Sequence, residues 1–423
     1  YSRTRFTLGN LGMAFNLYQG SGTLTSFTLG VGYSKLADFN TTSAAYGQGI
    51  DKSITDVLAE YMNGVPLSSL GHPDNDPYQP FRRADVGLWG GILAYQTGIL
   101  DPMSDAQDNK QYTVANNLAT GSRTNPSMRN VNKGSIDEYS ISGGFNIQNI
   151  LYLGFTIGIQ DILYRNDNYY AETYDNNSLP LNGMNYIRSL HLDGTGVNFK
   201  FGAVVRPIEN LRIGVAVHTP TLVSINEEYI EWMSADYKNT ARGELLDSPR
   251  SLNEYDINTP TRLLTGISYT LPGVGLITAD YERVWYNRMK LRNMGTENWD
   301  FQQTINNEVS SFYQPANNFR VGIEATPAQN FYIRAGYANY GECIATRDAF
   351  NNMSSINSYE NYSAGLGFRF QNMYVDLAYI YTEYKYAPYT MFYYGDPDYV
   401  VNPGNVETKQ SRNTITMSVG VRF

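Results

Sequence analysis

The sequence predicts an all-β protein, a transmembrane antiparallel up-and-down β-barrel, from its composition, its periodicity and the lengths of its connections. The chain of 423 residues contains 38 Gly and 36 Tyr, and only 17% of its residues are charged, against roughly 25% in soluble proteins. No apolar run approaches the ~18 residues of a membrane helix. Apolar residues instead alternate with small or polar ones, as in the strands of outer-membrane barrels.

The alternation is clearest at the C-terminal end, where Ile415, Met417, Val419 and Val421 share one face. We count thirteen such segments, near 5–18, 23–38, 136–147, 151–165, 194–206, 210–231, 260–270, 274–290, 319–325, 331–337, 362–370, 374–381 and 415–423. One face of each is apolar, and the other combines glycine with charge. In a membrane barrel the apolar face contacts lipid and the small or polar face lines the lumen.

Short and long connections between these segments follow one another without exception. The short ones are 19–22, 148–150, 207–210, 271–273, 327–329 and 371–372, and the long ones are 39–135, 166–193, 232–253, 291–314, 343–357 and 387–408. Short turns are periplasmic and long loops extracellular in such barrels, whose strand number is even. We therefore predict a single barrel domain over 1–423 with 14 strands. Its first strand, and an N-terminal plug with it, are expected before Tyr1.

Two of the long connections contain helical periodicity. Ile54, Val57, Leu58, Tyr61 and Met62 form one apolar stripe, which predicts a helix in the partly helical, extracellular loop 39–135. Weaker patterns predict helices over 82–98 and 300–312. A strand over 84–97 is the alternative, but it would break the alternation of short and long connections.

Composition also excludes several functions. A formal net charge of -9 disfavours nucleic acid, whose binding requires phosphate neutralisation. The single Cys343 rules out an internal disulfide, and His72, His191 and His218 lie too far apart in sequence for a metal motif. No nucleophile elbow is present, so we expect no enzyme activity, no cofactor and no metal site.

The predicted lumenal face carries many charges. They are Lys200, Arg212, Arg262, Arg320, Arg334, Arg369, Asp280, Glu282, Glu324 and Asp376. A cation among them would be able to hold a fatty-acid carboxylate through a charge-assisted hydrogen bond. The other reading is a ladder of Arg–carboxylate pairs that fills the lumen, since unpaired charges are costly there.

Two positions predict distortions of the wall. The apolar phase changes at Gly9-Asn10, which is typical of a β-bulge, and Pro220 interrupts another strand because proline cannot donate to the ladder. Either distortion is interpreted as an opening in the wall or as a feature that only shapes the barrel.

Several short segments resemble the FadL/TodX family of outer-membrane transporters for hydrophobic compounds. They are Gly30-Val-Gly-Tyr-Ser-Lys-Leu-Ala-Asp-Phe-Asn40, Val217-His-Thr-Pro-Thr221, Asp280-Tyr-Glu282, Arg334-Ala-Gly-Tyr337, Tyr362-Ser-Ala-Gly-Leu-Gly367 and the terminal Arg422-Phe423. The resemblance implies a monomeric barrel in the bacterial outer membrane that passes long-chain fatty acids or similar molecules. It also implies an N-terminal hatch with an Asn-Pro-Ala signature, which this sequence does not contain.

The function expected from these observations is passive uptake of hydrophobic molecules. The candidate capture residues in the extracellular loops are Leu58, Tyr61, Met62, Leu88, Trp89 and Phe301. Partners would be outer-membrane lipid, a hydrophobic small molecule and the barrel-assembly machinery, for which Phe423 resembles a C-terminal signal. The alternative is a barrel subunit or shuttle in a larger outer-membrane secretion or assembly complex, bound to other outer-membrane proteins through Tyr-rich loops.

Overall fold

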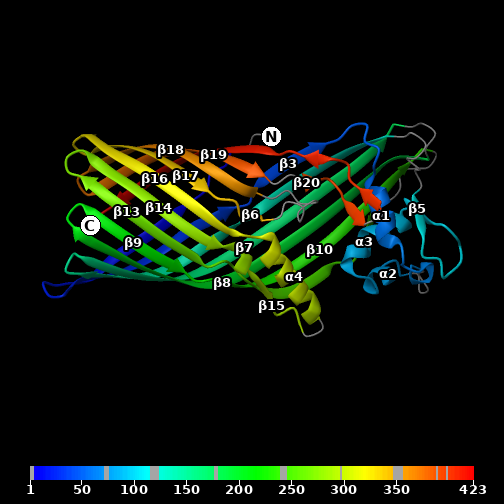
Figure 1. Cartoon of the computed structure of the whole chain (residues 1–423), viewed down its shortest axis with the longest axis horizontal. Helices are drawn as coiled ribbons and strands as arrows, with labels where there is room; N and C mark the ends of the chain where they lie inside the picture. The colour runs from blue at the N-terminus through cyan, green and yellow to red at the C-terminus, as the bar shows by residue number, and fades with distance from the viewer. Residues whose placement is uncertain are drawn as a thin grey trace.

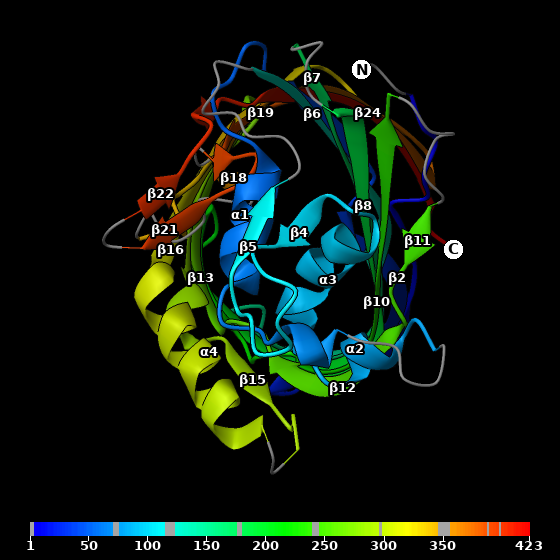
Figure 2. The same ribbon diagram turned by 90° about the vertical axis from the view of Figure 1, so that its right-hand side faces the viewer.

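The computed structural model describes residues 4–70, 76–114, 123–175, 180–238, 245–295, 298–345, 356–386, 389–396 and 399–423. Its main feature is one 18-stranded antiparallel sheet that curves into an elongated barrel (Figure 1). The strands form a ring when the barrel is viewed along its axis (Figure 2). The predicted fold class is therefore confirmed. No helix among the described residues combines the length and the apolar character needed to cross a bilayer.

The wall follows the chain order, with each strand paired to its neighbour. Its strands are β1 (Asn10–Gln19), β2 (Leu24–Asp38), β6 (Thr124–Ile147), β7 (Leu151–Tyr174), β8 (Leu181–Ile208), β9 (Leu211–His218) continued by β10 (Leu222–Tyr237), β12 (Ser251–Asn258) continued by β13 (Arg262–Leu271), β14 (Gly275–Trp285), β16 (Pro315–Ala328), β17 (Phe331–Tyr340), β18 (Ile356–Phe370), β19 (Met373–Tyr386) and β24 (Lys409–Val421). Short additions are β3 (Thr41–Tyr46), β11 (Leu246–Asp247) and β15 (Lys290–Arg292). The strand and plug predicted to precede Tyr1 lie outside this chain and stay predictions.

Alternation places the two faces as predicted. Large apolar side chains on one parity of each strand are exposed, for example Ile277 at 50% and Val321 at 53%. The opposite parity carries the small and charged residues. All six short turns lie at one end of the barrel (Figure 1). Gln148, Asn149, Asn330 and Gln371 have positive φ in these turns, as tight antiparallel hairpins require.

The extent of three predicted loops was wrong. Residues 39–135, 166–193 and 232–253 were expected as long connections, but β6 begins at Thr124, β7 continues to Tyr174, β8 begins at Leu181 and β10 reaches Tyr237. The ladder continues beyond the apolar band, where the outward side chains become polar and the apolar alternation disappears. The wall is consequently uneven: β8 has 28 residues and β14 only 11, so β6 to β10 rise well above β14 and β17 (Figure 1).

Short helices and ribbons fill the mouth on the tall side of the wall. The helices are α1 (Ile54–Met62), α2 (Gln79–Arg82), α3 (Trp89–Gln96) and, outside the ring, α4 (Trp299–Phe312), with 3-10 turns η1 (Leu67–Ser69), η2 (Val86–Leu88) and η4 (Tyr286–Arg288). The ribbons are β4 (Leu100–Pro102) with β5 (Tyr112–Val114), β20 (Tyr389–Thr390) with β23 (Asn405–Val406), and β21 (Tyr394–Asp396) with β22 (Tyr399–Val401). The predicted helices are confirmed, and a strand over 84–97 is excluded.

The hydrophobic core lies in this mouth and not in the membrane-level lumen. Met62 and Leu93 are fully buried between α1 and α3. They pack with inward residues of the tall strands, including Tyr170, Met184 and Met233. We call α1, α2, α3 and their connections the cap. It closes the ring in Figure 2.

We predict that Gly90→Val loosens the cap. A Cβ at Gly90 would lie 2.5 Å from the Tyr186 hydroxyl and 3.1 Å from Leu58 Cδ2, so a larger side chain must push α3 away from the wall. Overpacking of this kind costs about 1–3 kcal/mol. Hydrogen exchange of 89–96 should accelerate. Gly87→Val is the matched control, because nothing lies within 4 Å of a Cβ there; equal exchange in both variants would contradict the packing described.

Candidate functional site

The cap is anchored to the wall by a buried carboxylate, Glu172 on β7. Its side chain accepts hydrogen bonds from Ser53 Oγ (2.5 Å), the Ile54 backbone N–H (2.8 Å), the Tyr170 hydroxyl (2.5 Å) and the Tyr174 hydroxyl (3.0 Å). Ser53 is also the N-cap of α1, in a capping box with Asp56. Glu172 thus binds the first turn of α1, where free N–H groups and the helix dipole favour negative charge.

Burial raises the pKa of Glu172, and the hydrogen bonds from Ser53, Tyr170, Ile54 and Tyr174 oppose that rise. The carboxyl is 1% exposed. Burial also raises the pKa of both tyrosines well above the ordinary value. A carboxyl with a raised pKa holds its proton more tightly in the folded state than in the unfolded chain. Its ionised form at neutral pH therefore costs stability, which acidification relieves.

A second buried polar cluster lies beneath α3. Arg188 of β8 and Glu231 of β10 are cross-strand neighbours, and the Tyr229 hydroxyl donates to Glu231 Oε1 at 2.5 Å. Arg188 donates to Asn168 Oδ1 at 3.0 Å, while its Nε and Glu231 Oε2 have no hydrogen-bond partner. Burial raises the pKa of Glu231. Polar side chains of the wall therefore lie directly beneath the apolar cap.

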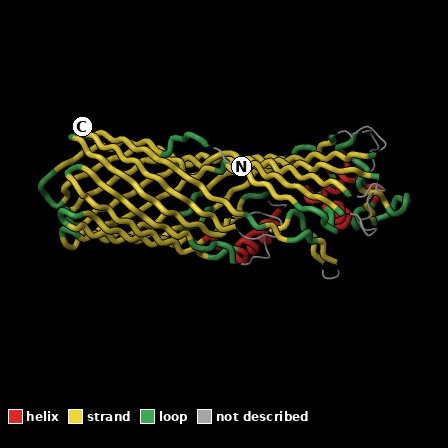
Figure 3. The backbone as a smooth tube through the Cα atoms, turned by 90° about the horizontal axis from the view of Figure 1, so that it is seen from above, coloured by secondary structure: helices red, strands yellow, loops and turns green. Residues whose placement is uncertain are grey.

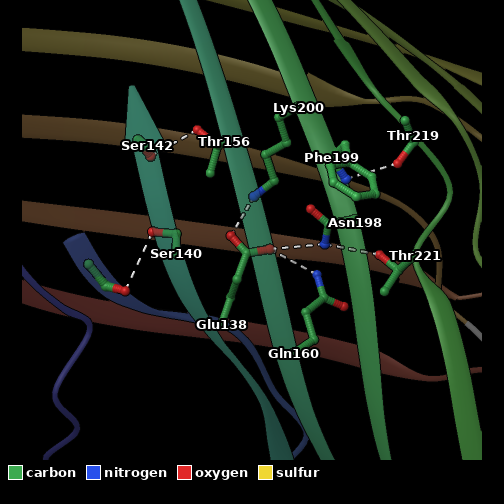
Figure 4. A network of polar contacts seen from close by, with 11 residues as sticks. Glu138, Ser140, Ser142, Thr156, Gln160, Asn198, Phe199, Lys200, Thr219 and Thr221 are labelled. Atoms are coloured by element: carbon green, nitrogen blue, oxygen red, sulfur yellow. Dashed lines mark hydrogen bonds and ion pairs between the residues drawn. The ribbon is translucent and has the colours of Figure 1, made fainter. Parts of the chain in front are cut away.

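Below the cap, the inner wall carries a network centred on Glu138 of β6 (Figure 4). Lys200 of β8 donates to Glu138 and forms an ion pair with it. Gln160 Nε2 (3.0 Å) and Asn198 Nδ2 (3.2 Å) both donate to Glu138 Oε2. Glu138 is only 4% exposed. Three adjacent strands are thus joined through one carboxylate.

An equivalent centre lies further round the inner wall, at Glu282 of β14. Arg320 forms an ion pair with Glu282, and Arg262 Nη1 lies 3.6 Å from its Oε1. Asn318 Nδ2 donates to Glu282 Oε2 at 3.2 Å. Like Glu138, Glu282 is 4% exposed. We call the two groups around Glu138 and Glu282 the polar belt.

Between these two centres, adjacent strands break at matching Thr-Pro-Thr segments, 219–221 between β9 and β10 and 259–261 between β12 and β13. Inward parity changes from even to odd at each break: His218 and Arg262 are paired below it, and Val223 and Ile257 above it. The prolines have no N–H for the ladder. β9 has 8 residues between a short turn and its break. In a strand tilted by about 40° these residues rise about 20 Å along the barrel axis, which places the breaks in the outer half of the apolar band.

Threonine hydroxyls replace the missing ladder bonds at these breaks. Thr259 Oγ1 accepts from the Thr221 N–H at 2.8 Å, and Thr219 Oγ1 accepts from the Phe199 N–H at 3.0 Å. The Thr221 hydroxyl accepts from Asn198 at 3.2 Å, so the break is connected to the Glu138 network (Figure 4). At the breaks, hydrogen bonds still join adjacent strands although the backbone geometry changes.

An apolar groove of about 580 Å³ runs below the breaks. Its lining residues come mainly from the lipid-facing parity of β8, β9, β13, β14 and β16, and include Ala203, Val215, Thr265, Ala279 and Phe319. The side chains at the base of the groove are small, so the wall is thin there. The groove and the double break occupy the same group of strands.

The capture residues predicted from sequence do not form one surface. Leu58, Met62 and Trp89 are buried in the cap core, with exposed fractions of 5%, 0% and 5%. Leu88 is partly buried against that core, and Tyr61 is 45% exposed and packs edge-on against Tyr394. Phe301 lies elsewhere, on α4, and is 56% exposed.

The predicted lumenal charges lie on the inward parity and several pair. Besides the belt, Arg334 bonds Glu324 at 2.7 Å and Asp376 at 2.5 Å. Arg369 lies 4.8 Å from the Tyr332 ring centroid, and Arg212 donates to Thr270 at 3.5 Å. Asp280 lies across the ladder from Gly266 and Arg320. No group of three or more metal-ligating side chains occurs in the part of the chain that is described.

The remaining predicted positions are at the ends of strands. β1 begins at Asn10, so Gly9-Asn10 is the start of the paired strand and not a bulge within it. The register shift of β1 against β2 lies instead between Asn16 and Tyr18. Phe423 follows the end of β24 and is fully exposed. It lies at the end of the barrel that carries the short turns (Figure 1). Pro220 lies in the double break.

Sequence reasoning missed many residues of this site, and three of them show why. Glu138 lies on the predicted inward face, and its place among the lumenal charges was readable from parity. Pro260 was readable from the repeat of Thr-Pro-Thr at 219–221 and 259–261. Glu172 had no signal, because it lay in a segment expected to be a loop.

Comparisons with known proteins give fold similarity at low identity. No family model matches the chain, and no curated protein matches it. The chain is similar to the crystal structure of a Pseudomonas aeruginosa FadL homologue, with TM-score 0.44 and 14% identity over 76% of this chain and 75% of that one. It is also similar to the Ralstonia pickettii toluene transporter TbuX, with TM-score 0.42 and 12% identity over 97% and 80%. The P. putida toluene transporter TodX gives TM-score 0.38 and 11% identity over 97% and 85%.

We predict that Glu172→Ala releases α1 from the wall. Four donors lose their acceptor, and leaving buried donors unsatisfied costs about 2–4 kcal/mol in all. Hydrogen exchange of 54–62 should accelerate while that of the wall strands is unchanged. Glu60→Ala is the control, since Glu60 bonds only its neighbour Asn63 at the surface. Retained protection of α1 in Glu172→Ala would show that its packing suffices without the anchor.

The pH dependence of the cap has a definite sign. Because the pKa of Glu172 is raised in the folded state, lowering the pH from 7 towards 5 should stabilise the docked α1. After correction for intrinsic rates, exchange protection of 54–62 should therefore rise on acidification. In Glu172→Gln this protection should rise less on acidification. Only Asp56 and Glu231, whose pKa values burial also raises, remain to titrate in that variant. An identical pH profile in both proteins would exclude Glu172 as the source.

Proposed function

We propose that the protein is a passive outer-membrane channel for hydrophobic small molecules, such as long-chain fatty acids or aromatic hydrocarbons, and not an enzyme. The observation that carries this proposal is the double Thr-Pro-Thr break beside a charge-paired belt. A molecule that passes the apolar cap meets charges below it and a discontinuous wall beside it.

Entry takes place at the cap. Within the cap, Tyr61 and Leu88 are the capture residues that keep exposed surface, and they border the apolar core formed by Leu58, Met62 and Trp89. That core is packed, so a ligand reaches it only when α1 and α3 separate from the tall wall. Glu172 and the Arg188–Glu231 cluster are polar contacts under this movable apolar layer, and they set how readily it moves.

The axial path is unfavourable for an apolar molecule. Passing it through the lumen would separate or dehydrate the ion pairs of Lys200, Arg320 and Arg334, and removing a partner from a buried charge is costly. Leaving sideways requires only that the breaks widen. The bilayer on the other side is apolar, and transfer of apolar surface from water to hydrocarbon drives the process without a cofactor.

The paired charges also favour a second function. A lumen closed by ion pairs suits a barrel that acts as a subunit of a larger outer-membrane complex, with its Tyr-rich extracellular loops as the protein contact. Native mass spectrometry of gently extracted protein distinguishes the two functions. A lone barrel with an adduct of fatty-acid or hydrocarbon mass supports the channel, and a stoichiometric assembly without such an adduct supports the subunit.

We predict that Pro220→Val with Pro260→Val reduces uptake. Valine restores an N–H at each break and favours extended backbone, which straightens the wall. Uptake of a radiolabelled long-chain fatty acid and of a monoaromatic hydrocarbon by cells carrying the protein should fall by about tenfold, equivalent to about 1.4 kcal/mol in the barrier. Pro207→Val with Pro327→Val, near the short turns, is the control. Unchanged uptake of both compounds by the first variant would exclude the break as the exit.

A further inference from the structure

A cluster of unpaired cations lies where the chain leaves the membrane on the low side of the wall. Residues 283–292 contain Arg283, Arg288, Lys290 and Arg292 and no acidic residue, although the chain as a whole has a net charge of -9. We call these four residues the basic rim patch. None of them forms an ion pair with an acidic side chain among the residues that the structure describes.

The patch is at the outer border of the apolar band. β14 begins directly after the turn at 272–274 and has 11 residues, which is the length that a tilted strand needs to cross a bilayer. The patch starts at Arg283, close to the outer end of β14. In Figure 1, where the long axis of the barrel is horizontal, β15 and α4 lie near the right-hand ends of the short strands, whereas the tall strands extend further to the right.

Its leading side chains point to the lipid side. Arg283 is paired with Leu263 and Asn317 on the outward parity, whereas Glu282 and Val284 are buried on the inward parity. The Arg283 and Arg288 guanidinium carbons lie 5.8 and 5.6 Å from the Trp285 ring centroid. Trp285 thus holds two cations near one another at the position where interfacial tryptophans are common.

Among the described residues, the acids on the elements beside the patch have other partners or lie exposed on α4. Asp256, across the ladder from Arg292, accepts from Ser224 at 2.7 Å and also from Asn293. Glu282 is bound inside the barrel by Arg320. Asp300 and Glu308 are exposed on α4. Arg283, Arg288 and Lys290 therefore have charge available for a ligand.

An apolar surface accompanies the charges. Asn306 of α4 accepts from the Leu291 N–H at 2.8 Å and donates to the Leu291 carbonyl at 3.0 Å, which fixes α4 against β15. At the start of this helix Trp299 is 61% and Phe301 56% exposed. On the lipid-facing parity of β16, Phe319 and Val321 are 54% and 53% exposed.

We propose that the basic rim patch binds the phosphate groups of a phosphorylated glycolipid in the outer leaflet, with Trp299 and Phe301 in contact with its acyl chains. Arginine binds phosphate through paired hydrogen bonds, and cations near a membrane surface attract anionic headgroups. The proposal rests on the outer-membrane placement above but not on what the channel carries. The bound lipid fixes the low side of the rim at the membrane surface.

The test measures lipid binding to the folded barrel. Detergent-purified protein is titrated with diphosphoryl lipid A, with its dephosphorylated form and with inorganic phosphate, and bound lipid is counted by native mass spectrometry. Arg283→Gln with Arg288→Gln should weaken binding of diphosphoryl lipid A by about tenfold. Arg83→Gln with Lys110→Gln removes the same charge from the exposed surface of the mouth and should leave binding of diphosphoryl lipid A unchanged. The dephosphorylated lipid should bind all proteins equally weakly.

Three results would overturn the proposal: equal loss in the two double variants, equal binding of the dephosphorylated lipid, or full competition by inorganic phosphate, which would indicate a simple anion site. Folding is checked by the mobility shift of unheated protein on gels. If Arg283→Gln prevents folding, Arg288→Gln with Lys290→Gln tests the same patch from outside β14. Hydrocarbon uptake should be retained in these variants, so a failure here is distinct from a failure of the proposed channel.

Discussion

The requirement that every backbone N–H and C=O in hydrocarbon be hydrogen-bonded governs this structure. A wall of antiparallel strands meets it, because the bonds run from strand to strand. The same requirement explains the chemistry of the double break. Proline removes donors there, and hydroxyls of Thr219 and Thr259 accept from the Phe199 and Thr221 N–H groups in place of carbonyls. The wall changes direction without leaving these groups unsatisfied.

The interior follows a complementary constraint. Carboxylates on the inward parity such as Glu138 and Glu282 are buried, and each is surrounded by several donors. Apolar packing is moved out of the membrane-level lumen and into the mouth, where Met62 and Leu93 are fully buried. The barrel therefore has an apolar closure above and a polar closure below, with the irregular part of its wall between them.

The sequence predicted the strands in the membrane well, because alternation is imposed there by lipid on one side and the lumen on the other. It failed above the membrane, where the outward side chains of β7, β8 and β10 become polar and the apolar alternation is lost. The helix over 54–62 was predictable from its stripe, but its partner Glu172 was not, because the contact joins residues 118 apart in sequence. Phe301 lies on the helix predicted over 300–312, but the sequence did not show that this helix is outside the ring and away from the other capture residues.

The uneven height of the wall has a consequence for how the molecule folds. The cap precedes β6 in the chain, but its supports are on β7, β8 and β10, which are made later. Contacts of such long sequence separation form slowly, because the loop between them must be closed first. The mouth is therefore completed after the tall hairpins, and until then the apolar faces of α1 and α3 need protection from other surfaces. A barrel whose tall strands were shortened would still insert, but would have no template on which to close its entrance.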